Sequence, residues 1–215
     1  MKYDPKFNKM WNKDLAYIFG LLLGDGSLPK SFTKRSKKYK NPIQKRHIIH
    51  FFSGSRKFIE IIYIPLFKKI FKLRPRIEIK KRKGYKNRYV ATIESKKIYE
   101  FLHGKGFTIG KKAKIAKIPN LPKKYYSYLL AGLLDTDGGK KGSGFGLSTA
   151  SKYLANFCIY CFNKFNLNYN STPWYYNDHI YHQVYLPRKY MKDLLKFVPI
   201  KNKDKINFIK LNSPR

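Results

Sequence analysis

Hydrophobic and polar positions along the chain follow two periods, which together predict alternating helices and strands. Apolar positions with helical spacing predict helices near residues 14–24 and 124–136 and over 55–71 and 151–165. Runs of alternating, β-branched and aromatic residues predict strands, of which the clearest are 46–53, 74–82, 85–94, 144–148, 168–176 and 179–186. A shorter helix is expected to close each half of the chain.

This series of elements is an internal repeat. The segment IFGLLLGDG at 18–26 recurs as LAGLLDTDG at 130–138. Two further matches follow in the same order, 53–58 with 149–154 and 95–99 with 187–191. Each half therefore predicts the order α-β-β-α-β-β-α and an α+β fold. We place the first repeat at 1–106 and the second at 124–215, joined by a basic linker over 107–123.

Turn-forming residues separate the predicted strands. Lys83-Gly84 lies between the last two strands of the first half, and Asn177-Asp178 lies between those of the second. The glycine-rich segment 142–146 lacks the Lys-Ser/Thr ending of a phosphate-binding loop, and we interpret it as a hairpin turn.

Alternation within the strands predicts a sheet face rich in basic, polar and aromatic side chains. In 74–82 the alternation places Arg76, Glu78, Lys80 and Arg82 on one face. A β-ribbon with such a face suits the DNA major groove, where Arg, Lys and Gln read base edges; a solvated face is the alternative. The residues predicted to contact DNA are Arg46, Arg76, Lys80, Arg82, Arg88, Tyr176, His182 and Gln183.

Composition makes a polyanionic partner the central expectation. The chain has 47 Lys and Arg against 12 Asp and Glu, a net charge of +35, yet 43% of its residues are hydrophobic and 17% aromatic. Such a chain builds a core and carries its charge on a folded surface, which favours DNA, RNA or an anionic membrane face as partner.

Other features narrow the setting. The longest apolar runs reach about ten residues, too few for a membrane span, and the N-terminus has no signal-peptide pattern. Cys158 and Cys161 lie in an apolar run and are expected in the core. We therefore expect an intracellular protein located with nucleic acid.

Two pairs of histidines are spaced by three residues on predicted strands. His47 and His50, like His179 and His182, fall on opposite strand faces, so neither pair is expected to share a metal.

Small residues form a stripe on each of two predicted helices. Ala16, Gly20 and Gly24 recur every four residues, and Tyr128, Gly132 and Thr136 occupy the corresponding positions in the second half. Such stripes let two helix backbones approach closely. We predict a helix interface at Gly20, Gly24, Gly132 and Thr136.

That interface would bring Asp25 and Asp137 together. A carboxylate at a helix C-terminus faces the negative end of the helix dipole, and two neighbouring carboxylates repel each other. A divalent cation such as Mg²⁺, bound by the carboxylates with water and phosphate oxygens, would resolve this conflict and could support phosphodiester cleavage. The alternative is that each Asp-Gly only ends its helix, with Gly26 and Gly138 as C-terminal caps.

The two segments resemble the signature motif of the LAGLIDADG homing endonucleases. The second matches the nonapeptide except at Leu134 and Thr136, and the first keeps Gly20, Leu21, Asp25 and Gly26. The resemblance implies a monomeric pseudo-dimer whose two antiparallel four-stranded sheets form a DNA-binding saddle. It implies cleavage of both strands of a long, weakly symmetric site, leaving short 3′ overhangs.

The resemblance also implies site residues. Asp25 and Asp137 would bind Mg²⁺, with Gly24 and Thr136 in the same metal site, which Mn²⁺ or Ca²⁺ can also occupy. Lys112 and Lys205 fit the positions of catalytic lysines. Other lysines lie close to both in the sequence, so the alignment with the family's catalytic position is open; they are Lys111, Lys114, Lys201 and Lys203. A plain phosphate contact is the alternative role for Lys112 and Lys205. Family members that place this lysine after the second strand would have it near Gly54 and Ala150, which are not basic. Asp135 has Leu23 as its counterpart, and we interpret it as structural or peripheral.

Three functional classes remain open. The first is a free-standing or intron-encoded DNA endonuclease, which the two aspartates favour. The second is a binding protein on the same scaffold, either an RNA maturase that assists intron splicing or a non-cleaving DNA-binding regulator. The third is a ribosome-associated basic protein, which accounts for the charge but not for the repeated motif.

Overall fold

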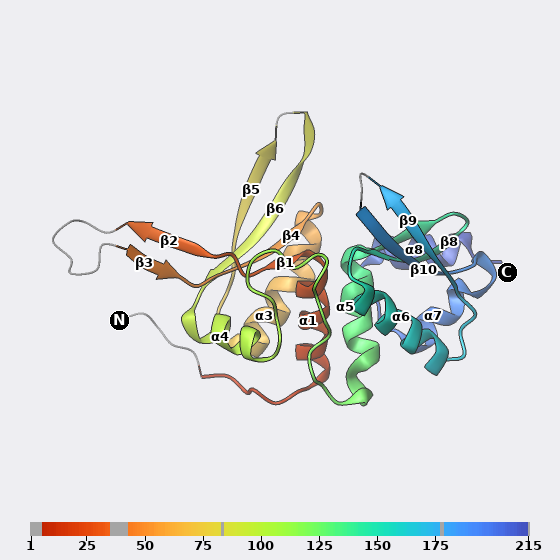
Figure 1. Ribbon diagram of the computed structural model, residues 1–215, viewed down its shortest axis with the longest axis horizontal. Coiled ribbons are helices and arrows are strands. Elements are labelled where there is room, and N and C mark those ends of the chain that lie inside the picture. Colours follow the sequence, from red (N-terminus) through yellow and green to blue (C-terminus); the bar gives the residue numbers. More distant parts are fainter. Residues whose placement is uncertain (1–5, 35–42, 83, 177–178, 215) are drawn as a thin grey trace. The chain divides into compact units, whose positions relative to one another are not determined.

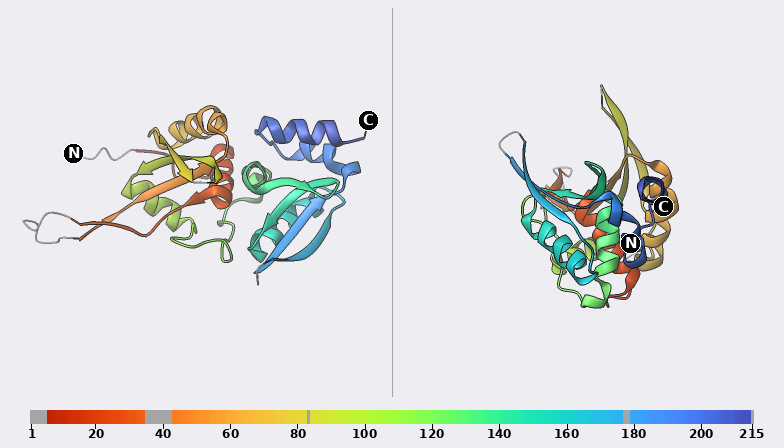
Figure 2. Two further views of the ribbon diagram at one scale, coloured as in Figure 1. Left: turned by 90° about the horizontal axis from the view of Figure 1, so that it is seen from above. Right: turned by 90° about the vertical axis from the view of Figure 1, so that its right-hand side faces the viewer.

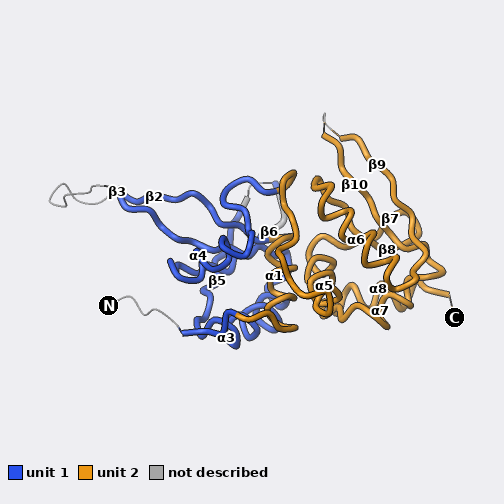
Figure 3. Tube along the Cα trace, turned by 60° about the horizontal axis from the view of Figure 1, so that its bottom comes forward, with its two compact units in different colours: residues 1–9, 26–112 blue, residues 10–25, 113–215 orange. Residues whose placement is uncertain are grey.

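The computed structural model describes residues 6–34, 43–82, 84–176 and 179–214 (Figure 1). The turn positions Lys83, Asn177 and Asp178 lie outside these residues. The chain forms two compact units, which Figure 3 shows in separate colours. Unit 1 comprises residues 1–9 and 26–112, and unit 2 comprises 10–25 and 113–215.

Unit 1 contains an antiparallel sheet of order β1-β4-β6-β5. The strands are β1 (Gly26–Ser27), β4 (Ile48–Ser53), β6 (Tyr85–Glu94) and β5 (Arg76–Arg82). A separate pair joins β2 (Ser31–Lys34) to β3 (Ile43–Arg46). The helices are α2 (Arg56–Phe58), the π-helical turn η1 (Ile59–Tyr63), α3 (Ile64–Phe71) and α4 (Lys96–Gly104).

The helices of unit 1 cover one face of its sheet (Figure 2). The side chain of Ser55 caps the first helical turn, since its Oγ accepts from Phe58 N at 3.2 Å. The π turn then leads into a helix with Pro65 in its first turn, whose ring nitrogen cannot donate a hydrogen bond. Lys72, with φ of 58°, ends the helix. Tyr63 stacks on Phe51 of β4 at 4.2 Å between ring centres, which fixes the helix against the sheet.

Unit 2 contains a second antiparallel sheet, of order β7-β8-β10-β9. The strands are β7 (Gly138–Lys141), β8 (Gly144–Thr149), β10 (His179–Leu186) and β9 (Asn170–Tyr176). Helix α6 (Lys152–Lys164) packs against β8 and β10. The other helices are α1 (Lys13–Asp25), η2 (Lys123–Tyr125), α5 (Tyr126–Asp137), η3 (Arg188–Tyr190), α7 (Met191–Phe197) and α8 (Lys203–Asn212).

The predicted α+β class with two four-stranded antiparallel sheets is confirmed, and the predicted α-β-β-α-β-β-α order occurs in both halves. The predicted strand 46–53 is wrong at its start. Arg46 ends β3, which pairs with β2, and β4 begins only at Ile48, where the chain turns to pair with β6. The strand pair β2-β3 and helix α8 are additions that the repeat did not predict. No helix among the described residues is long and apolar enough to cross a membrane.

Gly138 does cap the end of α5, since its N–H donates to Leu134 O, but it does so in an extended conformation. Gly138 has φ of −71° and ψ of 147°, so α5 runs directly into an extended strand, and Gly26 begins β1 immediately after α1. Gly138 is needed for space instead, since an added Cβ would strike the carbonyl oxygen of Leu134. The predicted hairpin turn near 142–146 lies at Gly142 and Ser143, where Gly142 has φ of 54°.

Candidate functional site

Helices α1 and α5 pack against each other within unit 2, and glycines set how closely they approach. A Cβ added to Gly20 would collide with the carbonyl oxygen of Leu129, and one added to Gly132 would collide with that of Tyr17. A Cβ on Gly24 would strike the Thr136 side chain and would lie 3.3 Å from the Asp137 Cγ. The structure thus brings together the four residues predicted at the helix interface, and only hydrogen fits at the central two.

Replacing Gly132 with alanine is expected to destabilise unit 2 by about 3 kcal/mol, at the upper end of the usual cost of overpacking. The atom that the new methyl group meets is a backbone oxygen of α1, which cannot rotate away. Gly104→Ala is the matched control, because nothing lies within 4 Å of its added Cβ. Urea unfolding of both variants would measure the effect, and equal stability of Gly132→Ala and the unmodified protein would contradict it.

Asp25 and Asp137 are the last residues of α1 and α5, and both are partly exposed. The Asp137 carboxyl lies against Gly24 of α1, and both carboxylates are close enough to Lys205 to raise the pKa of that amine. Two carboxylates at two helix C-termini make a negative site with oxygen donors, the type that Mg²⁺ and Ca²⁺ prefer. The donors therefore fit a divalent cation.

In the part of the chain that the structure describes, few other side chains near Asp25 and Asp137 supply oxygen ligands for a metal ion. The Thr136 hydroxyl points back to its own helix, donating to Gly132 O at 3.2 Å and Leu133 O at 2.9 Å. The hydroxyl proton of Thr136 is therefore used within its own helix, and the Thr136 carbonyl oxygen accepts from Lys205. Among the described residues, no group of three or more His, Cys, Asp and Glu side chains is placed to hold a metal ion. A cation bound by two carboxylates would complete its shell with carbonyl, water and phosphate oxygens.

Lys205, on α8, binds the end of helix α5. Its ammonium donates to the carbonyl oxygens of Leu134, Thr136 and Gly138 at 2.8, 2.9 and 2.7 Å. Burial lowers the pKa of this amine to about 8, opposed by the carboxylates of Asp135, Asp137 and Asp25. An ammonium has three protons, and here all three are donated to backbone oxygens. In the structure Lys205 thus holds the backbone on either side of Asp137, and its predicted catalytic role stays a prediction.

Asp135 also links α1, α5 and the segment before α8. Its carboxylate accepts from the Tyr17 hydroxyl at 2.5 Å and from the backbone N–H groups of Lys201 and Asn202 at 2.8 and 3.1 Å. Burial raises the pKa of Asp135, while these hydrogen bonds oppose the shift. In the first repeat, Leu23 stands at the matching position. Asp135 thus has a structural position beside the site, as its sequence context indicated.

Two further lysines bear on the site: Lys112, which was predicted to be catalytic, and Lys141, which the structure places near Asp137. Lys112, in unit 1, has its Nζ 6.0 Å from the centre of the Phe107 ring, and its catalytic role stays a prediction. Lys141, at the end of β7, is half-buried, and burial lowers its pKa while the Asp137 carboxylate raises it. The sequence analysis missed Lys141, although its position four residues after the motif aspartate was a usable signal.

The unit 1 sheet has one cationic face. The register places Arg76, Lys80 and Arg88 on the face opposite the helices. Lys80 Nζ and the Arg88 guanidinium lie 5.6 and 5.1 Å from the centre of the Phe52 ring, within cation–π range. Arg82 lies beyond a break in the register, and its side chain is outside the described part of the structure.

Acidic side chains accompany two of the predicted DNA-contacting arginines. Arg46 donates to both carboxylate oxygens of Glu94, at 3.2 and 2.7 Å. Arg76 pairs with Glu78 at 2.9 Å. Both pairs are solvent-accessible, so their value for stability is small. They restrict the orientation of the guanidinium groups.

The predicted contacts in unit 2 divide between two faces. Thr172 pairs with Gln183, Trp174 with Tyr181 and Tyr176 with His179, so these side chains share the face opposite α6. His182 shares the other face with the buried Val184 and Leu186. Adjacent strand residues point in opposite directions, so His182 and Gln183 cannot both belong to one binding face.

The α+β fold with two four-stranded antiparallel sheets matches that of solved LAGLIDADG homing endonucleases. No family model and no curated protein matches the sequence. Solved structures are nevertheless similar over most of the chain. I-DmoI in complex with DNA and Ca has a TM-score of 0.65 at 18% identity, covering 91% of this chain and 96% of that one.

Two further homing endonucleases show the same similarity. I-WcaI bound to its DNA recognition sequence has a TM-score of 0.56 at 19% identity, covering 94% of this chain and 87% of its own. The LAGLIDADG homing endonuclease I-LtrWI bound to target DNA has a TM-score of 0.60 at 11% identity, covering 93% and 89%.

Proposed function

We propose that this protein is a monomeric, site-specific DNA endonuclease that uses a divalent metal to cut both strands of a long duplex target and leaves short 3′ overhangs. The observation that carries the proposal is the convergence of α1 and α5, whose final residues Asp25 and Asp137 form one acidic site. One chain contains both aspartates. Structures of the same fold in complex with DNA and with Ca, Mn or Mg support this function.

Each residue of the site then has a defined task. Asp25 and Asp137 would hold the metal, and the carbonyl oxygens of Gly24 and Thr136 lie at the same helix ends. A bound divalent cation supplies an activated water and neutralises charge on the leaving oxygen. Lys205 fixes the backbone on both sides of Asp137, and Lys141 adds a cation beside it for the phosphate. Together these groups would support hydrolysis of a phosphodiester.

A cleavage assay tests the proposal directly. The protein is incubated with a plasmid library containing a randomised segment, with Mg²⁺ or with EDTA, and the DNA ends are sequenced. Discrete, Mg²⁺-dependent breaks with a fixed 3′ overhang would support the proposal. Tight binding of duplex DNA or structured RNA without breaks would contradict it and favour a maturase or a regulator.

Binding is expected to depend steeply on salt, because lysines and arginines release counterions from the phosphates they contact. Lys80→Met and Arg88→Met should each reduce the slope of log K against log salt by about 1. Lys57→Met is the matched control, since its helix α2 packs on the opposite face of the sheet through Phe58 and Phe51. Mobility-shift titrations at several salt concentrations measure the slopes, and an unchanged slope in both sheet variants would contradict the expectation.

A further inference from the structure

The two sheet faces differ in chemistry. On the unit 1 face, the charged side chains are three cations and the carboxylates of Glu78 and Glu94, beside the hydrogen-bonded pair His50 and Thr92. Arginine and lysine carry only donors, and the base edge with two adjacent acceptors in the major groove is that of guanine. The carboxylates of Glu78 and Glu94 accept hydrogen bonds, which on a base edge suits the amino group of cytosine. The unit 1 face therefore has the chemistry of G·C recognition.

Phe52 gives this cationic face a fixed geometry. Lys80 and Arg88 are direct cross-strand partners, and both cations lie over the same ring. Arg76 is held by Glu78 of the same strand, and Arg46 of β3 is held by Glu94 of β6. Side chains restricted in this way lose less conformational freedom when they bind a base edge.

The unit 2 face has no charge on β9 and β10, while Lys141 of the outer strand β7 lies on the same face by register. Neither β9, NSTPWYY, nor β10, HIYHQVYL, contains Lys, Arg, Asp or Glu. The face instead presents aromatic rings beside an amide. The Trp174 ring centre lies 5.5 Å from that of Tyr176 and 5.5 Å from that of Tyr181. Trp174 and Tyr176 remain 45% and 55% exposed, which leaves an apolar ridge open to a partner.

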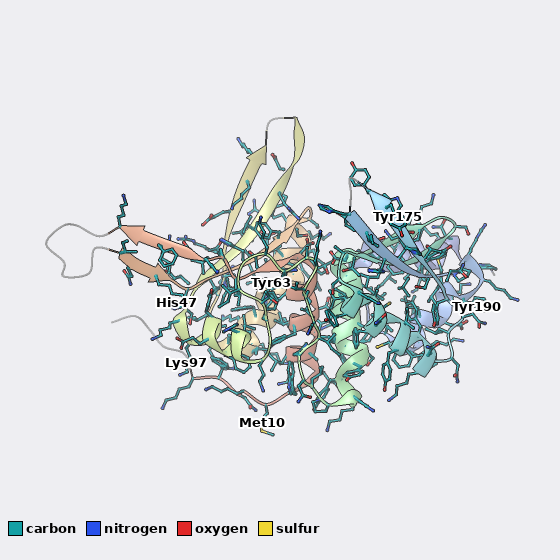
Figure 4. All side chains as sticks on the ribbon, viewed as in Figure 1. Met10, His47, Tyr63, Lys97, Tyr175 and Tyr190 are labelled. Atoms are coloured by element: carbon teal, nitrogen blue, oxygen red, sulfur yellow. The ribbon has the colours of Figure 1, made fainter. Side chains whose placement is uncertain are left out.

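Figure 4 labels two tyrosines: Tyr63, which is buried in the core of unit 1, and Tyr175, which lies on β9 of unit 2. Tyr175 is 70% exposed but lies on the opposite face from Trp174 by strand alternation. It therefore stays outside the ridge of Trp174, Tyr176 and Tyr181.

An aromatic ridge beside a glutamine matches A·T pairs. In the major groove, only thymine presents a methyl group, and glutamine pairs with the donor and acceptor of adenine. Gln183 lies on the same face as the ridge, two residues along β10 from Tyr181. With no cation on β9 or β10, this part of the surface gains little from phosphates and must gain affinity from the base edges.

We propose that the two sheets read base pairs of different composition, the unit 1 face preferring G·C pairs and the unit 2 face preferring A·T pairs. The target duplex then has one G·C-containing half and one A·T-rich half. This inference rests on the proposed function, since it requires that both faces contact duplex DNA.

Selection of bound duplexes from a randomised library, in Ca²⁺ buffer, tests the proposal. The recovered sequences should have one half with fixed G·C pairs and one A·T-rich half. Arg88→Gln should reduce the guanine preference at one position of the first half by about tenfold, and Gln183→Arg should exchange adenine for guanine at one position of the second. Arg56→Gln, which removes an equal charge from helix α2, should leave the selected sequence unchanged.

A second measurement isolates the methyl groups. Deoxyuridine in place of thymidine removes only the methyl, and in the A·T-rich half it should weaken binding by about fourfold for each buried methyl. The same replacement in the other half should have little effect, and Trp174→Ala should abolish the difference. Thermal melting checks that the variants fold.

The outcomes separate the two proposals. Duplex binding with equal composition in both halves, or with no response to Arg88→Gln, Gln183→Arg and deoxyuridine, would overturn the inference and leave the endonuclease intact. Failure to retain any duplex would overturn the proposed function and the inference together.

Discussion

Replacing Asp25 or Asp137 with asparagine is expected to abolish double-strand cleavage, by at least about 10³-fold, while duplex binding is retained. Asparagine has the shape of aspartate but lacks the charge that a divalent cation requires. Each aspartate ends one of two packed helices, so neither variant disturbs the glycine contact between them. Plasmid cleavage with Mg²⁺ and mobility shifts with Ca²⁺ measure the two properties separately.

The same substitutions should leave stability equal or slightly higher. A carboxylate at a helix C-terminus is repelled by the negative end of the helix dipole. Neutralising it should therefore raise the free energy of unfolding by up to about 1 kcal/mol. Asp193→Asn on α7 is the matched control, because that carboxylate pairs with Lys196 at the surface and should not affect cleavage. Undiminished cleavage by either motif variant would refute the assignment of the site.

Replacing Lys205 with methionine is expected to reduce cleavage by about 10²-fold and to lower the free energy of unfolding by about 1–3 kcal/mol. Methionine preserves the length of the side chain but leaves three carbonyl oxygens at the end of α5 without their donor. The backbone around Asp137 then loses its fixed position, and small displacements of a reacting group have large kinetic effects. Cleavage rates and urea unfolding measure the two changes.

The pattern across these measurements distinguishes positioning from direct phosphate contact. Lys203→Met is the control, since Lys203 is exposed two residues earlier on the same helix. A positioning role predicts that stability and cleavage fall together for Lys205 and that neither falls for Lys203. Loss of cleavage with unchanged stability would instead indicate that the Lys205 ammonium contacts the phosphate directly.

Local patterns were enough for the features set by short-range chemistry. The alternation in 74–82 correctly placed Arg76 and Lys80 on one face, because strand geometry alternates side chains with a period of two. The same rule could have separated His182 from Gln183. The end of one strand and the start of the next at His47 could not be predicted from local sequence, because β3 pairs with β2 whereas β4 pairs with β6.

The sequence by itself determined the repeat, the α+β class and the glycine stripe that leads to Asp25 and Asp137, whereas the two four-stranded sheets were implied by the family resemblance. The first three follow from periodicity and from the size of side chains at fixed spacing. Only the tertiary structure decided that Lys205 binds the end of α5, that Tyr17 donates to Asp135 and that Lys141 lies near Asp137. Lys205 is 67 residues from Gly138, and Tyr17 is 118 from Asp135, so no local period connects them. Hydrogen bonds over such separations form only once the packing of several elements has fixed where each side chain ends.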